Sequence, residues 1–211
     1  MSDVKEFDTR PAGNPSAESP LAWTFHRQGV LPRDANAGVR LREKSFLGHL
    51  ILRGGAIILD EAVREVLGMA LPARPNTLTL DESGERSIQW LSPDEWLVIV
   101  PGGEEFALES RLRKAMGQAH YSIINVSGGQ TVFTLQGEKA REVLMKSTLY
   151  DVHTQAFAVG KGVSTVFAKS TVVLRRPNED SWELVVRRSF ADYCYRWLLD
   201  AAAEYGAIVE R

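Results

Sequence analysis

The stretch that decides the fold is SWELVVRRSFADYCYRWLLDAAAEYG at Ser181–Gly206, near the end of a chain of 211 residues. Its apolar residues recur first at every second position and then at every third or fourth, which predicts a strand running directly into an amphipathic helix. The change of period falls at Ser189, and Asp192 three places later completes a capping pattern in which the carboxylate favours the positive end of the helix. The side chains predicted to be buried together are Trp182, Leu184, Val186, Phe190, Cys194 and Trp197.

The same strand-then-helix unit occurs three more times upstream, after strands predicted at 46–53, 96–100 and 131–136. The first of these helices is expected to begin at Asp60, a suitable cap residue, and the second to end at Gly117. Additional strands are predicted at 77–80, 87–90, 121–126, 163–168 and 171–174. Because strands outnumber helices and several are adjacent, we expect an α+β fold with helices covering mixed sheets, built as two interlocked ferredoxin-like halves.

The N-terminal region differs in character from the rest of the chain. Residues 1–20 carry three prolines among small and charged residues, a composition typical of a flexible tail. In residues 21–42, Leu21, Trp23 and Phe25 alternate before glycine and proline interrupt the pattern, which indicates an arm. Two interpretations stay open: the arm covers the edge of its own sheet as a strand, or it clasps a partner. Residues 43–211 are expected to form a single domain.

The last helix has a second apolar stripe that the predicted core does not need. Tyr195 and Leu199 lie four residues apart, on the face away from Phe190, Cys194 and Trp197. A helix that is apolar on two faces is covered twice, either by the arm of its own chain or by another protein. We therefore predict an interface with a partner; its candidate residues are Trp23, Phe25, Tyr195 and Leu199.

Composition excludes several classes of function. Lys and Arg total 25 against 27 Asp and Glu, so the net charge of −2 gives no electrostatic support for nucleic-acid binding. Apolar runs extend to about five residues, far short of the roughly 20 that span a membrane, and the N-terminus lacks the features of a secretory signal. We expect a soluble cytoplasmic protein. Cys194 is the only cysteine and lies in the apolar stripe, so we expect a small buried side chain rather than a reactive thiol.

No motif in the chain predicts catalysis. The four histidines lack metal-ligand spacing, and the paired glycines complete no nucleotide-binding loop. Ser127 stands outside any GxSxG motif and is expected in a turn between two strands, while Asp94 and Glu95 fit a turn before a buried strand. We therefore predict no catalytic, cofactor-binding or metal-binding residue in this chain.

Three segments together carry a resemblance to a known family. They are LSPDEWLVIVP at Leu91–Pro101, INVSGGQTVFTLQGEKAREVLMK at Ile124–Lys146, and the stretch at Ser181–Gly206. In this order and at this length the chain resembles the gamma subunit of heterotetrameric sarcosine oxidase, roughly from Ser19 to Gly206. That family is similar to the amino-terminal, folate-binding part of the glycine-cleavage T-protein, so residues 43–211 are expected to form a T-protein-like α+β domain.

The resemblance implies a function for a complex rather than for this chain alone. Such a complex demethylates sarcosine oxidatively to glycine and passes the one-carbon unit to tetrahydrofolate. It implies alpha and beta subunits with FAD, FMN and NAD, a delta subunit with zinc, and folate held outside this chain. In the wider family the hairpin at 163–174 carries an acidic pair, whereas this chain has Lys169 and Ser170 there and no carboxylate.

A cation cannot stabilise positive charge on a folate nitrogen, which argues against an autonomous aminomethyltransferase. We therefore expect a non-catalytic assembly subunit. Two alternatives stay open: the small subunit of a related N-methylglutamate dehydrogenase, and a stand-alone folate-binding module.

Overall fold

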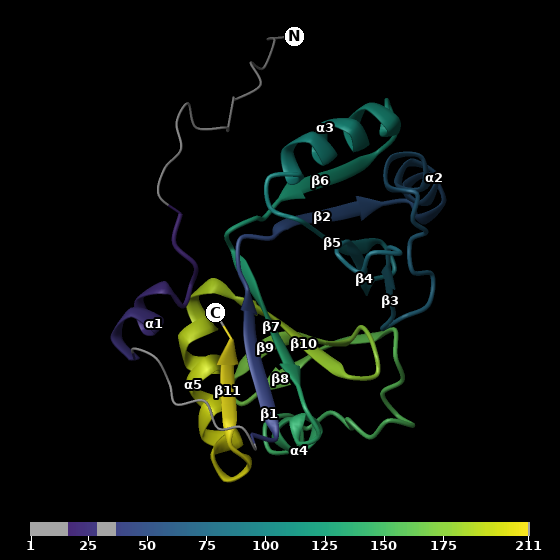
Figure 1. The fold of residues 1–211 in the computed structure, drawn as a ribbon. Coiled ribbons are helices and arrows are strands. Elements are labelled where there is room, and N and C mark those ends of the chain that lie inside the picture. The colour runs from purple at the N-terminus through teal and green to yellow at the C-terminus, as the bar shows by residue number, and fades with distance from the viewer. Residues whose placement is uncertain (1–16, 29–36, 211) are drawn as a thin grey trace.

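The computed structural model describes residues 17–28 and 37–210, and the tail assigned to residues 1–20 lies mostly outside this part. The described chain forms four layers, in which two β-sheets face each other and helices cover the outer face of each (Figure 1). The α-helices are α1 (Ala22–Gln28), α2 (Ala56–Leu67), α3 (Glu105–Met116), α4 (Ala140–Met145) and α5 (Ala191–Ala202). No described helix is long and apolar enough to cross a membrane.

One half of the molecule is a five-stranded antiparallel sheet in the order β3-β4-β5-β2-β6. Its strands are β2 (Gly48–Gly54), β3 (Leu78–Leu80), β4 (Ser87–Ser92), β5 (Glu95–Val100) and β6 (Tyr121–Asn125). α2 and α3 pack on one face, where Leu50, Leu52, Val98 and Val100 are buried. The succession β2-α2-β4-β5-α3-β6 is the ferredoxin-like pattern.

The other half is a six-stranded sheet in the order β11-β1-β7-β10-β9-β8, covered by α4 and α5. Its strands are β1 (Val39–Lys44), β7 (Gln130–Gln136), β8 (Lys161–Phe167), β9 (Ser170–Arg176), β10 (Ser181–Arg187) and β11 (Ala207–Glu210). β1 is inserted between β7 and β11, so a strand that precedes the first half in sequence belongs to the second sheet. The two ferredoxin-like halves are thus interlocked, as the sequence predicted.

The stretch that decides the fold forms β10 followed by α5, with a short 3₁₀ turn at Arg188–Phe190 between them. Trp182, Leu184, Val186 and Cys194 are buried together, as expected. The capping prediction was wrong: the residue preceding α5 is Phe190, no side chain caps the helix, and Ser189 lies within the 3₁₀ turn. Phe190 was also expected in the core, yet 42% of it is exposed, because it belongs to the 3₁₀ turn, which has no buried residue, and not to the helix.

Two further boundaries differ from the sequence predictions. α2 begins at Ala56, one turn before Asp60. Asp60 instead accepts hydrogen bonds from the Leu71 amide (2.8 Å) and from Nε of Arg64 (2.7 Å), which ties the helix to the segment that follows it. In the predicted arm, residues 22–28 form the helix α1 rather than a strand, and the arm's last residues belong to β1. Residues 29–36 lie outside the described part.

Candidate functional site

The predicted second stripe on α5 is covered by the chain itself. Tyr195 is 1% exposed and packs edge to face against Phe25 of α1, with ring centroids 5.5 Å apart. Its hydroxyl donates to Oε1 of Gln28 at 2.9 Å. Tyr195 is therefore a core residue and offers no surface to a partner, because α1 packs on the face of α5 that carries the second apolar stripe. Of the two interpretations of the stripe, coverage by the arm of the same chain is the correct one for Tyr195.

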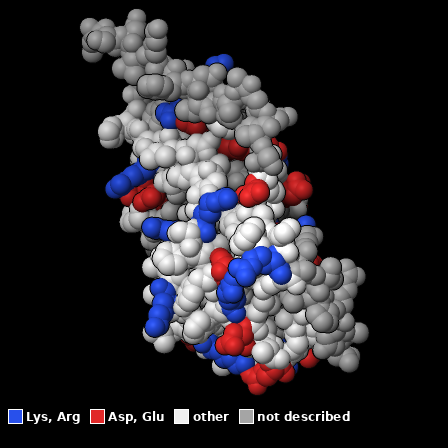
Figure 2. Space-filling view, turned by 90° about the vertical axis from the view of Figure 1, so that its left-hand side faces the viewer, with Lys and Arg blue, Asp and Glu red and all other residues white. Residues whose placement is uncertain are grey.

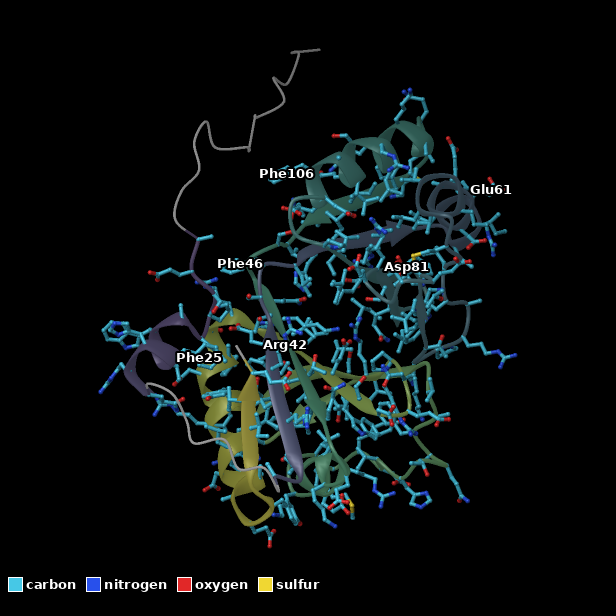
Figure 3. All side chains as sticks on the ribbon, in the orientation of Figure 1. Phe25, Arg42, Phe46, Glu61, Asp81 and Phe106 are labelled. Atoms are coloured by element: carbon cyan, nitrogen blue, oxygen red, sulfur yellow. The ribbon has the colours of Figure 1, made fainter. Side chains whose placement is uncertain are left out.

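The other candidates in the predicted interface have different positions. Leu199 is half-buried against the helical core, and Phe25 is half-buried between α1 and α5 (Figure 3). Trp23 is 68% exposed and stacks on His26 with ring centroids 6.0 Å apart. The structure thus brings Phe25 and Tyr195 together and leaves Trp23 as the candidate that faces outward.

The helix α1 is anchored to the start of α5 by polar contacts as well. The hydroxyl of Thr24 donates to the carboxylate of Asp192, which also accepts from Nε of Arg196 at 2.8 Å. Burial works to raise the pKa of Asp192, but these two donors hold it below its ordinary value. Nη2 of Arg188 donates to the backbone carbonyl of Glu18 at 3.0 Å. α1 is therefore an integral part of this half of the molecule.

Between the two sheets lies an ionic network that sequence reasoning missed. Arg175 donates from Nε to Oε2 of Glu183 at 3.1 Å and from Nη1 to Oγ of Ser87 at 2.9 Å. Lys44 donates to the other oxygen, Oε1 of Glu183, at 2.6 Å. Arg175 and Glu183 are each 3% exposed. Burial works to raise the pKa of Glu183, and the opposing charges of Arg175 and Lys44 outweigh it and keep the pKa below its ordinary value.

A cavity of about 370 Å³ opens beside this network. Both sheets line it: Arg42 and Lys44 come from β1, and Ser87 comes from β4. Its charges balance, because the cations Arg42, Lys44 and Arg175 face the carboxylates Glu43, Glu85 and Glu183. Since both oxygens of Glu183 accept from cations, this buried carboxylate is committed to structure and is not poised as a base.

The other residues that the sequence offered as candidates for catalysis or reactivity lie in turns or in the core. Ser127 lies in the turn between β6 and β7, as predicted, and its Oγ accepts from the His49 amide at 2.9 Å. Asp94 lies in the turn between β4 and β5 and accepts from Oγ of Ser92 at 2.8 Å. Lys169 lies in the turn that joins β8 and β9, next to Ala168. Cys194 is fully buried, as predicted, and burial raises the pKa of its thiol to about 11.

One buried histidine could not be assigned from the sequence. His49 is 1% exposed, its Nδ1 lies 3.0 Å from the Leu47 carbonyl, and its Nε2 has no partner among the described residues. Burial lowers its pKa from 6.5 to about 4, so the ring is neutral at physiological pH. Within residues 17–28 and 37–210, no three His, Cys, Asp or Glu side chains are grouped so as to hold a metal ion.

Comparison with known proteins adds to these observations. The model of the sarcosine oxidase gamma subunit family matches residues 54–204. The chain is 34% identical over 188 residues to the sarcosine oxidase gamma subunit of Corynebacterium sp. strain P-1, covering 86% of this chain and 89% of that one. It is 35% identical over 170 residues to the gamma subunit of Corynebacterium sp. strain U-96, covering 80% and 82%.

Solved structures agree with the sequence matches. A chain of the heterotetrameric sarcosine oxidase from Corynebacterium sp. U-96, in complex with pyrrole 2-carboxylate, matches with a TM-score of 0.77 and 31% identity, covering 92% of this chain and 99% of that one. The glycine-cleavage aminomethyltransferase T from Bartonella henselae shares the fold at a TM-score of 0.67 and 16% identity, over 92% of this chain and 59% of that one. By family model, sequence identity and structure, the chain belongs to the sarcosine oxidase gamma subunit family.

Proposed function

We propose that this chain is the gamma subunit of a heterotetrameric sarcosine oxidase and serves as a non-catalytic assembly subunit. The observation that carries the proposal is the match over nearly the whole of both chains to one chain of such a heterotetramer. In this proposal the alpha, beta and delta subunits are its partners. They hold the FAD, FMN, NAD and zinc and the tetrahydrofolate that accepts the one-carbon unit.

The interior of the molecule supports a non-catalytic role. The described residues place the buried Arg175–Glu183 pair between the two sheets, beside the cavity that both sheets line. Chemistry on a folate nitrogen needs a free carboxylate inside the site. Of the three carboxylates that line the cavity, the buried Glu183 is occupied by Lys44 and Arg175, Glu43 accepts from the Thr131 hydroxyl, and Glu85 is exposed to solvent. The hairpin at 163–174 provides none either. These residues do not fit folate chemistry, so we derive no reaction step in this chain.

The exposed Trp23 keeps the predicted partner interface as a proposal for one of its four candidate residues. Trp23 is exposed on a helix that the rest of the chain holds firmly, and large aromatic side chains at the centre of a contact contribute strongly to association. We propose that Trp23 contacts a partner subunit, while Phe25 and Leu199 serve mainly to seat α1 and α5. Replacement of Trp23 by Ala should weaken assembly and leave the melting temperature of the chain alone nearly unchanged.

A reconstitution experiment tests the proposed function. The other three subunits are co-expressed with and without this chain. Oxidation of sarcosine or N-methylglutamate, followed as oxygen consumption and as reduction of an artificial electron acceptor, is measured alongside flavin absorption. We expect the chain alone to show neither flavin absorption nor activity, and its omission to lower the yield of active complex. Stoichiometric flavin on the isolated chain would refute the non-catalytic role, and preference of the complex for N-methylglutamate would identify the related dehydrogenase.

A further inference from the structure

The loop between β1 and β2 holds a phenylalanine in an unfavourable backbone conformation. Phe46 has φ = +61°, in the left-handed region where its Cβ crowds the backbone. Among the described non-glycine residues, only Asn76 and Ala168 share a positive φ. The loop is braced by Gly102, because a Cβ placed there would lie 1.9 Å from the Phe46 carbonyl oxygen. Such strain persists only where the surrounding structure enforces it, and it often marks a functional position.

The ring that this strained loop presents takes no part in the core. Phe46 is 56% exposed and belongs to none of the three apolar clusters of the described chain. Its neighbour Leu47, by contrast, packs on the cluster between the sheets. Figure 3 shows Phe46 on the same side of the molecule as Phe25 of α1. The backbone of this loop therefore places Leu47 between the sheets and the ring of Phe46 in solvent.

A second exposed aromatic ring lies at the same end of the six-stranded sheet. Phe190, 42% exposed, follows the end of β10, just as Phe46 follows the end of β1. Only β7 separates these two strands, with Lys44 opposite Val132 on one side and Arg187 opposite Gln130 on the other. The two strand ends are thus about 12 Å apart, since they are separated by two strand spacings across the sheet and two residues along it. α1, with the exposed Trp23, is anchored to α5 immediately after Phe190.

The charge beside Phe190 is positive. Arg187 and Arg188 are exposed next to Phe190, and neither forms an ion pair within the described residues. Arg188 donates to a backbone carbonyl. The nearest acidic side chains in sequence are both engaged elsewhere, Glu183 by Lys44 and Arg175 and Asp192 by Thr24 and Arg196. On the side of the molecule that carries α1, acidic and basic side chains are interspersed with uncharged surface, and several of them lie next to one of opposite charge (Figure 2).

We propose that Phe46 and Phe190, framed by Arg187 and Arg188, form a docking surface for another subunit of the oxidase. The chemistry of the surface requires a partner with an apolar pocket edged by carboxylates, since the aromatic rings would fill the pocket and the guanidinium groups would meet the acidic rim. The inference rests on the proposed function, because it takes the partner from the same complex.

Competition during assembly tests this surface. The wild-type chain and a variant are co-expressed with the other three subunits, one of which carries the tag, and mass spectrometry of the purified complex gives the ratio of the two competing chains. The variants are Phe46→Gly and the charge reversal Arg187→Glu with Arg188→Glu. Ala168→Gly is the control for relieved strain, because Ala168 has a similar φ of +52°. Ile57→Ala is the control for an exposed apolar side chain, because Ile57 is 77% exposed on α2.

Phe46→Gly should separate folding from assembly. Glycine adopts a positive φ freely, so the melting temperature of the chain alone should be unchanged or raised. Incorporation into the complex should fall at least about tenfold relative to the wild type, and by a similar factor for the charge reversal. Both controls should compete equally with the wild type.

The same experiment distinguishes refutation of the docking surface from refutation of the proposed function. Equal incorporation of wild type, Phe46→Gly and the charge reversal would refute the docking surface and leave the function intact. A large drop in the melting temperature of Phe46→Gly would assign the ring to the fold and also refute the proposal. If the wild-type chain itself is absent from the complex, the proposed function fails and the docking surface fails with it.

Discussion

The buried pair between the sheets gives a sharp test of how the two halves are held together. In Glu183→Gln the side chain keeps its shape but loses its charge, so the Arg175 guanidinium, 3% exposed, has no counter-charge at its side. Breaking a buried ion pair by removing one partner costs about 3–5 kcal/mol. Because the Lys44 side chain is 40% exposed and can return to solvent, we expect the low end of this range, about 3 kcal/mol.

Chemical and thermal unfolding of the purified chain measure this loss. For a chain of this size, 1 kcal/mol corresponds to about 2–4 °C in melting temperature, so a loss of 3 kcal/mol corresponds to about 6–12 °C. Glu109→Gln is the matched control, since Glu109 pairs with Arg113 on the surface of α3 and such pairs contribute about 0.5 kcal/mol or less. A double variant, Arg175→Met with Glu183→Leu, should recover most of the loss because neither buried charge remains.

Equal, small losses for Glu183→Gln and Glu109→Gln would contradict this reasoning. Such a result would mean that water reaches Arg175 and that the space between the sheets is open rather than sealed by the network. A double variant less stable than Glu183→Gln would also contradict it. That result would show that the attraction between Arg175 and Glu183 stabilises the contact between the halves, beyond avoiding an unpaired buried charge.

Three other predictions follow from the burial of single side chains. Tyr195→Ala should cost about 3–5 kcal/mol in the chain alone, measured by urea unfolding, and a loss near zero would return Tyr195 to the interface. Trp197→Ala should cost about 2–3 kcal/mol, less than a fully buried tryptophan, because Trp197 is half-buried; a loss as large as that of Tyr195→Ala would contradict this. The pKa of His49 is lowered from 6.5 to about 4 in the folded chain. As the pH falls, His49 is therefore protonated in the unfolded chain at a higher pH than in the folded chain. Stability should therefore be complete above pH 6.5 and decline by up to about 3 kcal/mol toward pH 4, and His49→Gln should flatten this decline in pH-dependent unfolding curves.

Local patterns were sufficient to predict most of the elements. Alternating apolar residues and breakers such as Gly117 located the strands and helices of both halves, because these signals are contained in a few neighbouring residues. α1 was misread because Leu21, Trp23 and Phe25 alternate. Counting Thr24, which is buried, gives the helical spacing of Leu21, Thr24, Phe25 and Gln28. β1 and β11 went unpredicted because each pairs with a strand far away in sequence: Val39 lies opposite Ala207, and Lys44 lies opposite Val132.

The interior of the site could not be predicted because it depends on how the halves meet. Alternation in β10 indicates one buried face, whereas the second sheet buries the other face as well, including Val185 and Glu183. The sequence did contain one signal for a buried ion pair: Glu183 is a charged residue that stands among apolar residues of the predicted strand. Whether Tyr195 was covered by α1 or by a partner was likewise a question of tertiary packing that the helical period alone leaves open.

Native mass spectrometry of the complex purified through a tag on this chain tests the central proposal most directly. We predict one assembly that contains this chain with three further subunits and oxidises sarcosine. We also predict that flavin stays with the other subunits when this chain is dissociated from them. Recovery of the chain alone, or of this chain carrying the flavin after dissociation, would contradict its assignment as a non-catalytic assembly subunit.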